Sequence, residues 1–242
     1  MLLSIIVLTK DRSHLLAAAL ESIVKQTFSD FEVVVVNDGS VDETAQVLLN
    51  WLSRLPLVII VHPVSCGITE SRQEALLASR GEFVAFLDDD DIWVDKEKLK
   101  KQIDYLNQNS KVVLVGGGIE VGSQKKFRPE TDSAIRKSML FRNNFFTSTV
   151  VFRKEVALKA GGFIPDWVDL VEDYDLWLRM GKLGQMHNFQ ESFAVYAKSS
   201  YNKDKFKKFL RKQFSLIRKN RNFYPNYFLA SVILYVRVLF GF

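Results

Sequence analysis

The sequence has little cysteine, glycine and proline, and each shortage excludes a class of protein. Its one cysteine, Cys66, cannot form a disulfide within the chain or a cysteine-based zinc site, so a cytosolic protein is expected. Twelve glycines and five prolines among 242 residues exclude collagen-like and low-complexity chains, and 12% aromatic residues argue against disorder. The apolar run at the amino terminus stops at Leu8 and has no positive charge before it, so no signal peptide is expected. A globular chain of one or two domains remains.

The net charge of +5 is unevenly distributed. Residues 203–221 contain nine Lys or Arg and one acid, Asp204, which gives this segment a net charge of +8 and leaves −3 for the rest of the chain. The main part of the protein therefore has no excess of positive charge that would form a nucleic-acid-binding face.

The first half of the sequence alternates continuous apolar runs with segments of helical periodicity. Strands that are apolar on both faces and separated by helices predict a parallel sheet that is covered on both sides. The predicted strands are residues 4–8, 31–36, 57–61 and 83–87, and the predicted helices are residues 13–26 and 69–79, with a further helix between the second and third strands. Ser40 and Glu43 have the spacing of a capping box and are predicted to open that further helix.

The second half of the sequence is less regular. The helices predicted there are residues 96–109 and 172–180, and the predicted strands are residues 112–115, 148–152 and 193–196. Residues 119–147 are polar and receive no assignment.

Polar residues follow three of the predicted strands at the point where each strand ends. They are residues 9–12, 37–40 and 88–91, and the last group is four consecutive aspartates. Because the carboxyl ends of parallel strands meet at one edge of a sheet, a ligand site is expected there. Neighbouring carboxylates repel one another, and a divalent cation such as Mg²⁺ or Mn²⁺ would remove that repulsion. The alternative is a solvated acidic turn that caps the helix after it.

Two adjacent acids, Glu172 and Asp173, stand at the start of the predicted helix 172–180. Acids in a first helical turn often only complement the helix dipole. Near a metal, a carboxylate that stays ionised at this position could instead accept a proton from an attacking hydroxyl.

Six segments, in order, resemble the motifs of glycosyltransferase family 2, whose members are inverting enzymes with a GT-A fold. The segments are SIIVLTKDR (4–12), NDGSVDET (37–44), CGITESRQ (66–73), FLDDDD (86–91), GGF (161–163) and EDYDLWLR (172–179). Each is weak alone, but six in this order are specific, and the resemblance covers roughly residues 3–200.

The resemblance implies a role for particular residues of this chain. The residues implied to bind the nucleotide sugar are Thr9, Asp11, Asp38, Arg72, Asp88 and Asp89. Asp90 with Asp88 is implied to hold Mn²⁺ or Mg²⁺ at the diphosphate, and Asp173 is implied to be the general base with Glu172 as its neighbour.

The sequence departs from the family pattern in several places. Asp11 replaces a usual Asn but keeps an acceptor, and Cys66 and Gln73 also stand where Asn is usual. A Tyr-Arg-x-His segment of many relatives corresponds here to residues 196–199, which lack the histidine, so a third protein ligand for the metal is left open. Lys198 in that segment could approach the phosphates.

The carboxyl-terminal segment 201–242 predicts a basic amphipathic helix followed by an apolar one. Apolar residues recur at helical spacing from Phe206 to Ile217, with Lys and Arg between them. Such a helix predicts binding to an anionic membrane surface, and the alternative is a helix that packs on the domain with a solvated basic face. The apolar end from Tyr227 is shorter than the roughly 20 residues of a spanning helix and contains Arg237.

Together these patterns predict an α/β protein: a GT-A domain over residues 1–200 with a Rossmann-like, mostly parallel sheet and helices on both faces. Residues 1–115 are expected to bind the nucleotide sugar, residues 116–200 to bind the acceptor, and residues 201–242 to form the helical tail. The expected function is metal-dependent, inverting transfer of a sugar from a UDP-, GDP- or dTDP-linked donor to a glycan or lipid-linked acceptor in bacterial surface polysaccharide synthesis. We expect no nucleic-acid partner and a cytoplasmic location at the inner face of the plasma membrane. A non-catalytic nucleotide-sugar-binding or scaffolding protein is the alternative.

Overall fold

The computed structural model describes residues 2–165, 170–197 and 203–240. Within these ranges the strands form one nine-stranded sheet in the order β3-β2-β1-β4-β8-β6-β9-β5, with β7 paired to β6. The strands are β1 (Leu3–Thr9), β2 (Phe31–Asp38), β3 (Leu57–His62), β4 (Phe83–Phe86), β5 (Ile92–Trp93), β6 (Val112–Val121), β7 (Gln124–Lys126), β8 (Val151–Arg153) and β9 (Gln185–Val195). The helices are α1 (Ser13–Val24), α2 (Thr44–Trp51), α3 (Ile68–Ala78), α4 (Lys98–Gln108), α5 (Asp132–Ser138), α6 (Lys154–Lys159), α7 (Glu172–Met180), α8 (Lys203–Lys219) and α9 (Tyr227–Phe240), and a 3-10 turn, η1, spans Thr147–Thr149.

The four strands of the amino-terminal half are parallel and covered on both faces, as the sequence predicted. β1 pairs with β2 and β4, and β2 pairs with β3. Successive residues of β1 enter different cores: Ile6 belongs to the cluster that includes α3 and α7, and Ile5 to the cluster of α1, α2 and α4. Burial on both faces explains why these strands are continuous apolar runs in the sequence.

The other half of the sheet contains antiparallel pairs. β8 is antiparallel to β4 and to β6, whereas β6 is parallel to β9. The strand predicted to end at Val115 is longer, because β6 continues through the glycines at 116–118. A Cβ on Gly117 would lie 2.3 Å from the ring of Phe193, so the absent side chain allows the two strands to approach closely.

The capping box predicted at Ser40 is wrong. α2 begins at Thr44, whose backbone N–H donates to Asp42 at 3.0 Å. The Ser40 hydroxyl instead accepts a hydrogen bond from the backbone N–H of Asp11 at 3.0 Å. Ser40 therefore joins the loops after β1 and β2 rather than opening a helix.

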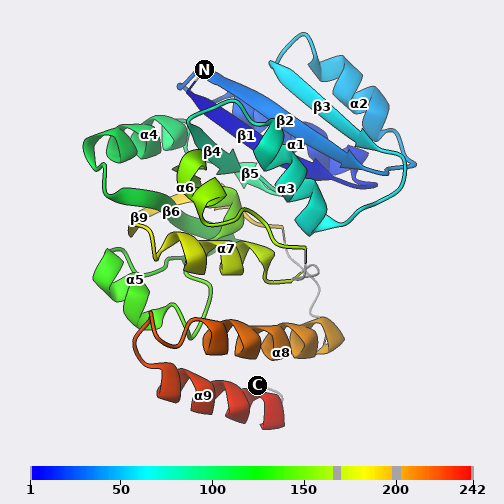
Figure 1. Cartoon of the computed structure of the whole chain (residues 1–242). Coiled ribbons are helices and arrows are strands. Elements are labelled where there is room, and N and C mark those ends of the chain that lie inside the picture. Colours follow the sequence, from blue (N-terminus) through cyan, green and yellow to red (C-terminus); the bar gives the residue numbers. More distant parts are fainter. Residues whose placement is uncertain (1, 166–169, 198–202, 241–242) are drawn as a thin grey trace.

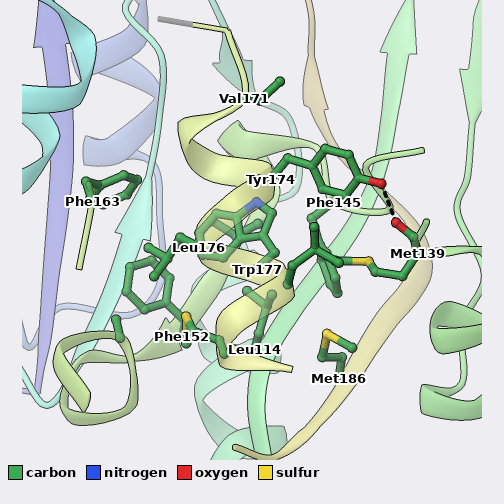
Figure 2. Close-up of a cluster of buried hydrophobic side chains, with 14 of the residues drawn as sticks. Leu114, Met139, Phe145, Phe152, Phe163, Val171, Tyr174, Leu176, Trp177 and Met186 are labelled. Atoms are coloured by element: carbon green, nitrogen blue, oxygen red, sulfur yellow. Dashed lines mark hydrogen bonds between the residues drawn. The ribbon is translucent and has the colours of Figure 1, made fainter. Parts of the chain in front are cut away.

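An aromatic cluster fixes α7 against the sheet. Figure 2 shows Tyr174 and Trp177 projecting from α7 among buried apolar side chains. The Trp177 ring is fully buried, with its centre 5.4 Å from that of Phe152 and 6.4 Å from that of Phe145. The Tyr174 hydroxyl donates to the carbonyl of Met139. The start of α7, which carries the two predicted catalytic acids, is therefore held by a rigid core.

The carboxyl-terminal segment forms a helical pair, α8 and α9, and α8 lies between α9 and the rest of the protein (Figure 1). Leu216 and Ile217 of α8 are buried in the same cluster as α7, and Gln213 Nε2 donates to the carbonyl of Phe141 at 3.0 Å. The apolar side of α8 thus packs on the domain, which is the second of the two alternatives that the sequence left open for this helix. Among the described residues, no helix has the length and apolar character needed to cross a membrane.

Candidate functional site

A cavity of about 520 Å³ lies where the carboxyl ends of β1, β2 and β4 meet. Six of the residues that the family resemblance assigned to the nucleotide sugar or the metal are among its lining residues: Thr9, Asp38, Arg72, Asp88, Asp89 and Asp90. The edge of the sheet at which the sequence predicted a ligand site therefore holds a cavity rich in polar side chains.

Three of the four aspartates after β4 face this cavity and meet two arginines. Asp88 accepts a hydrogen bond from Arg72 Nη2 at 3.1 Å. Arg12 Nη1 lies 2.8 Å from Asp89 and 3.0 Å from Asp90. These arginines partly neutralise the carboxylates that the sequence places side by side.

Asp91 has a different environment from the other three aspartates. It is buried, and its Oδ2 accepts a hydrogen bond from Ser148 Oγ at 2.5 Å. Burial raises the pKa of Asp91 to about 7, although the Ser148 hydrogen bond opposes this rise. Asp91 therefore ties the segment to the protein interior.

The carboxylates of Asp88 and Asp90 fit a divalent cation. Their side chains are 38% and 31% exposed, and both line the cavity. Partial burial raises the pKa of Asp88, and the charges of Asp90 and Asp173 raise it further against the opposing charge of Arg72. A cation would remove this repulsion, and carboxylate oxygens are the donors that Mg²⁺ and Mn²⁺ prefer.

Asp38, at the end of β2, holds the loop that follows β3. Its carboxylate accepts hydrogen bonds from Ser65 Oγ at 2.6 Å, from the backbone N–H groups of Cys66 at 2.7 Å and Gly67 at 3.0 Å, and from His62 Nδ1 at 2.7 Å. Burial opposes ionisation, but these hydrogen bonds lower the pKa of Asp38 to about 2. The carboxylate therefore shapes one wall of the cavity.

His62 lies between two carboxylates. Its Nδ1 contacts Asp38, and its Nε2 lies 2.7 Å from Glu74 Oε2. The hydrogen bond with Asp38, and then that with Glu74, raises the pKa of His62. Ligand atoms of Asp38, His62 and Cys66 lie within 4.8 Å of one another, a grouping that sequence spacing did not indicate. Both oxygens of Asp38 already accept hydrogen bonds, so the group acts here as an anchor for the loop.

Arg72 and Glu172 form a buried ion pair beside the cavity. Arg72 Nη1 lies 2.6 Å from Glu172 Oε1, and each side chain is only 7% exposed. The guanidinium carbon is 5.3 Å from the centre of the Phe86 ring. Burial raises the pKa of Glu172, and the Arg72 charge opposes that rise. Because Arg72 also contacts Asp88, it joins α3, the aspartate segment and the first turn of α7.

Asp173 is half-buried in the first turn of α7, where the helix dipole favours a negative charge. Its Oδ2 accepts hydrogen bonds from Thr147 Oγ1 at 2.6 Å and Asn143 Nδ2 at 3.3 Å. Its charge contributes to raising the pKa of both Asp88 and Arg72, so the base predicted from the sequence lies close to the predicted metal ligands.

Two sequence predictions fall outside this arrangement. Asp11 is exposed and not among the lining residues, and its Oδ1 accepts a hydrogen bond from the backbone N–H of Val41 at 2.7 Å. Its part in nucleotide-sugar binding stays a prediction. Lys198, predicted to approach the phosphates, lies outside the described residues.

Sequence reasoning missed several residues that organise the site. The sequence motifs include Arg12 without indicating a role for it, and they do not distinguish Asp91 from the other three aspartates. Thr147 and Ser148, which contact Asp173 and Asp91, lie at the junction of the unassigned stretch and a predicted strand. Their one signal is the polar sequence Thr-Ser-Thr directly before an apolar strand.

Comparison with known sequences finds the model of the family described as Glycosyl transferase family 2, matched over residues 4–164. The amylovoran biosynthesis glycosyltransferase AmsE of Erwinia amylovora is 34% identical over 181 residues, which are 72% of this chain and 67% of that protein. The O-antigen biosynthesis glycosyltransferase WbnJ of Escherichia coli is 30% identical over 169 residues, which are 67% of this chain and 65% of that protein. The chain thus spans about two thirds of the length of these relatives.

Two solved structures share the fold. S. aureus TarS 1-349 in complex with UDP-GlcNAc has a TM-score of 0.74 and 20% identity, with 90% of this chain and 66% of that chain covered. The mannosyltransferase PcManGT from Pyrobaculum calidifontis, in complex with GDP-Man and Mn²⁺, also has a TM-score of 0.74, at 18% identity and with 99% of this chain and 70% of that chain covered.

Proposed function

Because the chain belongs to glycosyl transferase family 2, we propose that it transfers a sugar, with inversion, from a nucleoside diphosphate to an acceptor hydroxyl. One observation carries the proposal: the open carboxylates of Asp88 and Asp90 line a cavity beside the helix start that presents Asp173. Direct displacement of a nucleoside diphosphate needs positive charge at the leaving group and a base on the opposite face of the sugar.

In the proposed reaction Asp173 accepts the proton of the acceptor hydroxyl while that oxygen bonds to the anomeric carbon. The bond from this carbon to the diphosphate oxygen breaks in the same step, and a single displacement inverts the configuration. A divalent cation held by Asp90 and Asp88 would supply positive charge to the departing diphosphate. Arg12, which contacts Asp89 and Asp90, adds a fixed positive charge at the same edge of the cavity.

The donor occupies the cavity with its nucleoside against Thr9, Asp38 and Arg72 in this proposal. UDP-, GDP- and dTDP-sugars are the candidates, and the first two types occur in the two solved structures compared above. Residues 1–115 would thus serve the donor, and residues 116–200, which include Asp173, would serve the acceptor. The names of the two sequence relatives support an acceptor in bacterial surface polysaccharide synthesis.

A donor screen with the variant Asp90→Ala tests this function. We expect one class of nucleoside-diphosphate sugar, with Mn²⁺ present, to raise the unfolding temperature of the wild-type chain and to release nucleoside diphosphate slowly. Asp90→Ala should lose the Mn²⁺-dependent part of both signals, since it removes one of two carboxylate ligands. Asp104→Ala is the matched control, because Asp104 is exposed on α4 and its ion pair within the described part of the chain is with Lys100 alone.

Binding of a donor without release under any condition would favour the alternative, a nucleotide-sugar-binding or scaffolding protein. Equal metal-dependent signals in Asp90→Ala and wild type would contradict the assignment of the metal ligands.

We further propose that the helical pair binds an anionic membrane surface, at the inner face of the plasma membrane, and brings the enzyme to a lipid-linked acceptor. The outer side of α9 is apolar, and the exposed fractions of its side chains are 79% for Phe228, 53% for Leu229, 43% for Val232, 60% for Tyr235 and 44% for Val236. α8 adds exposed basic side chains, among them Lys208, Arg211 and Arg218. An exposed apolar helix face beside basic residues is typical of interfacial binding to anionic lipid.

Flotation with liposomes tests the membrane proposal. We expect binding to phosphatidylglycerol vesicles, weaker binding to phosphatidylcholine, and loss of binding in the triple variant Phe228→Gln, Val232→Gln, Tyr235→Gln. The control triple variant Leu49→Gln, Leu52→Gln, Leu77→Gln changes similarly exposed apolar residues on α2, directly after it and on α3, and it should keep binding. Substitution is preferable to deletion of residues 203–242, because deletion would remove the buried Leu216 and Ile217 and expose the part of the core against which they pack. A change of oligomeric state with unaltered flotation would show instead that α9 is an interface between copies.

A further inference from the structure

The 3-10 turn η1 touches both groups of acidic residues from one short segment. Its three residues, Thr147, Ser148 and Thr149, are all buried. The proposed reaction gives this turn no role, yet two adjacent side chains of it contact Asp173, the proposed base, and Asp91, the buried anchor of the aspartate segment that holds the donor side.

Ser148 fixes the turn to the donor side of the site. Its hydroxyl accepts a hydrogen bond from the backbone N–H of Asp88 at 3.0 Å and donates to Asp91 Oδ2 at 2.5 Å. Its carbonyl accepts a hydrogen bond from Trp93 Nε1 at 2.6 Å. Three hydrogen bonds thus hold this residue against the 88–93 segment.

Thr147 reaches the acceptor side of the site from the same turn. Its hydroxyl lies 2.6 Å from Asp173 Oδ2. An ionised carboxylate only accepts hydrogen bonds, so the hydroxyl must be the donor. The other oxygen, Asp173 Oδ1, accepts a hydrogen bond from the backbone N–H of Tyr174 at 2.6 Å. Asn143 Nδ2 donates a longer hydrogen bond, of 3.3 Å, to the same Oδ2 that Thr147 contacts. Both oxygens of the carboxylate are therefore held, and a lone pair of Oδ1 remains for an incoming hydroxyl.

We propose that Thr147 is a positioning residue: its hydroxyl sets the carboxylate of Asp173 at a fixed place relative to the aspartate segment, to which Ser148 anchors the turn. The inference rests on the proposed function, because it takes Asp173 as the general base. A base displaced by about 1 Å lowers the rate by about 100-fold even where binding is unaffected. Loss of the Thr147 hydroxyl should therefore reduce kcat and leave donor binding intact.

The variants Thr147→Val and Thr147→Ser test this role. Thr147→Val keeps the shape of the side chain and removes the donor, so we expect kcat to fall about 10- to 100-fold, with the donor KM and the nucleotide affinity within about twofold of wild type. Thr147→Ser restores the hydroxyl, and its kcat should lie within about threefold of wild type.

Thr149→Val is the matched control within the same turn. The Thr149 hydroxyl donates to the carbonyl of Phe146 at 2.7 Å and accepts from the backbone N–H of Gly117 at 3.1 Å. These contacts support the fold, so Thr149→Val should lower the unfolding temperature while the folded enzyme keeps its kcat.

Wild-type kcat in Thr147→Val would overturn the proposal, as would failure of Thr147→Ser to restore kcat in a folded protein. An equal loss of kcat in Thr147→Val and Thr149→Val would overturn it too, since the turn would then act only through the fold. Asp173→Asn, measured in parallel, distinguishes the base role of Asp173 from the positioning role of Thr147. Full activity in Asp173→Asn would disprove the proposed base. An inactive Asp173→Asn together with a fully active Thr147→Val would disprove only the positioning role.

Discussion

Replacement of Asp173 by asparagine is expected to lower kcat for sugar transfer by about 10²- to 10⁴-fold, the range that a positioned general base contributes. Asparagine keeps the size and shape of the side chain, and its amide oxygen can still accept the hydrogen bond that Thr147 donates. It cannot take a proton from the acceptor hydroxyl. The loss should therefore appear in the chemical step, with little change in the binding of donor or metal.

Steady-state transfer assays and calorimetric titration with the nucleoside diphosphate measure the two effects separately. Nucleotide affinity in the presence of Mn²⁺ should stay within about threefold of wild type, because the proposed reaction places Asp173 against the acceptor hydroxyl and not against the nucleotide. Asp104→Asn makes the same chemical change at an exposed carboxylate paired with Lys100 and serves as the control. A kcat within about tenfold of wild type in Asp173→Asn would contradict the assignment of the base.

The position of the cavity could be predicted from the sequence for a simple physical reason. Strands buried on both faces are visible as continuous apolar runs, and parallel strands bring the residues that follow them to one edge. Thr9, Asp38 and Asp88 follow three such strands, and all three line the same cavity. The four consecutive aspartates also indicated a cation site, since the repulsion between neighbouring carboxylates follows from their positions in the sequence.

The contacts that orient these side chains could not be predicted, because they join segments far apart in the sequence. Thr147 lies 26 residues from Asp173, and Ser148 lies 57 residues from Asp91. Local rules also failed where a tertiary contact competed with them. The hydroxyl of Ser40, which has capping-box spacing, accepts a hydrogen bond from the loop after β1 instead.

The amphipathic pattern of α8 is a second case in which the sequence predicts a helix but not its tertiary contacts. Periodicity identifies an apolar face but does not say what covers it. In the structure the core of the domain covers that face, and the exposed apolar side belongs to α9, which the sequence presents only as an apolar end.

Replacement of Arg72 by methionine is expected to destabilise the fold by about 3–5 kcal/mol, because it leaves a buried acid without its partner. Glu172 and Arg72 are each only 7% exposed, so water cannot reach the unpaired carboxylate of Glu172 unless α7 moves. Urea unfolding at pH 8 measures the loss. Arg54→Met is the control, because the Arg54–Glu21 pair is 46% and 38% exposed and should contribute less than about 1 kcal/mol.

The loss in Arg72→Met should depend on pH in a direction fixed by Glu172. Burial raises the pKa of this acid above its value in the unfolded chain, so between the two values the folded state binds more protons and stability falls as the pH rises. Without Arg72 the pKa of Glu172 in the folded state rises further, and the difference in stability from wild type should be smaller near pH 5.5 than at pH 8.

The double variant Arg72→Met, Glu172→Gln removes the unpaired charge and should recover most of the stability. It should not recover activity, because Arg72 also contacts Asp88. If the single variant were as stable as wild type at pH 8, the ion pair would not be what holds the first turn of α7 against the donor side. The packing of Trp177 against Phe152 and Phe145 would then have to hold that turn.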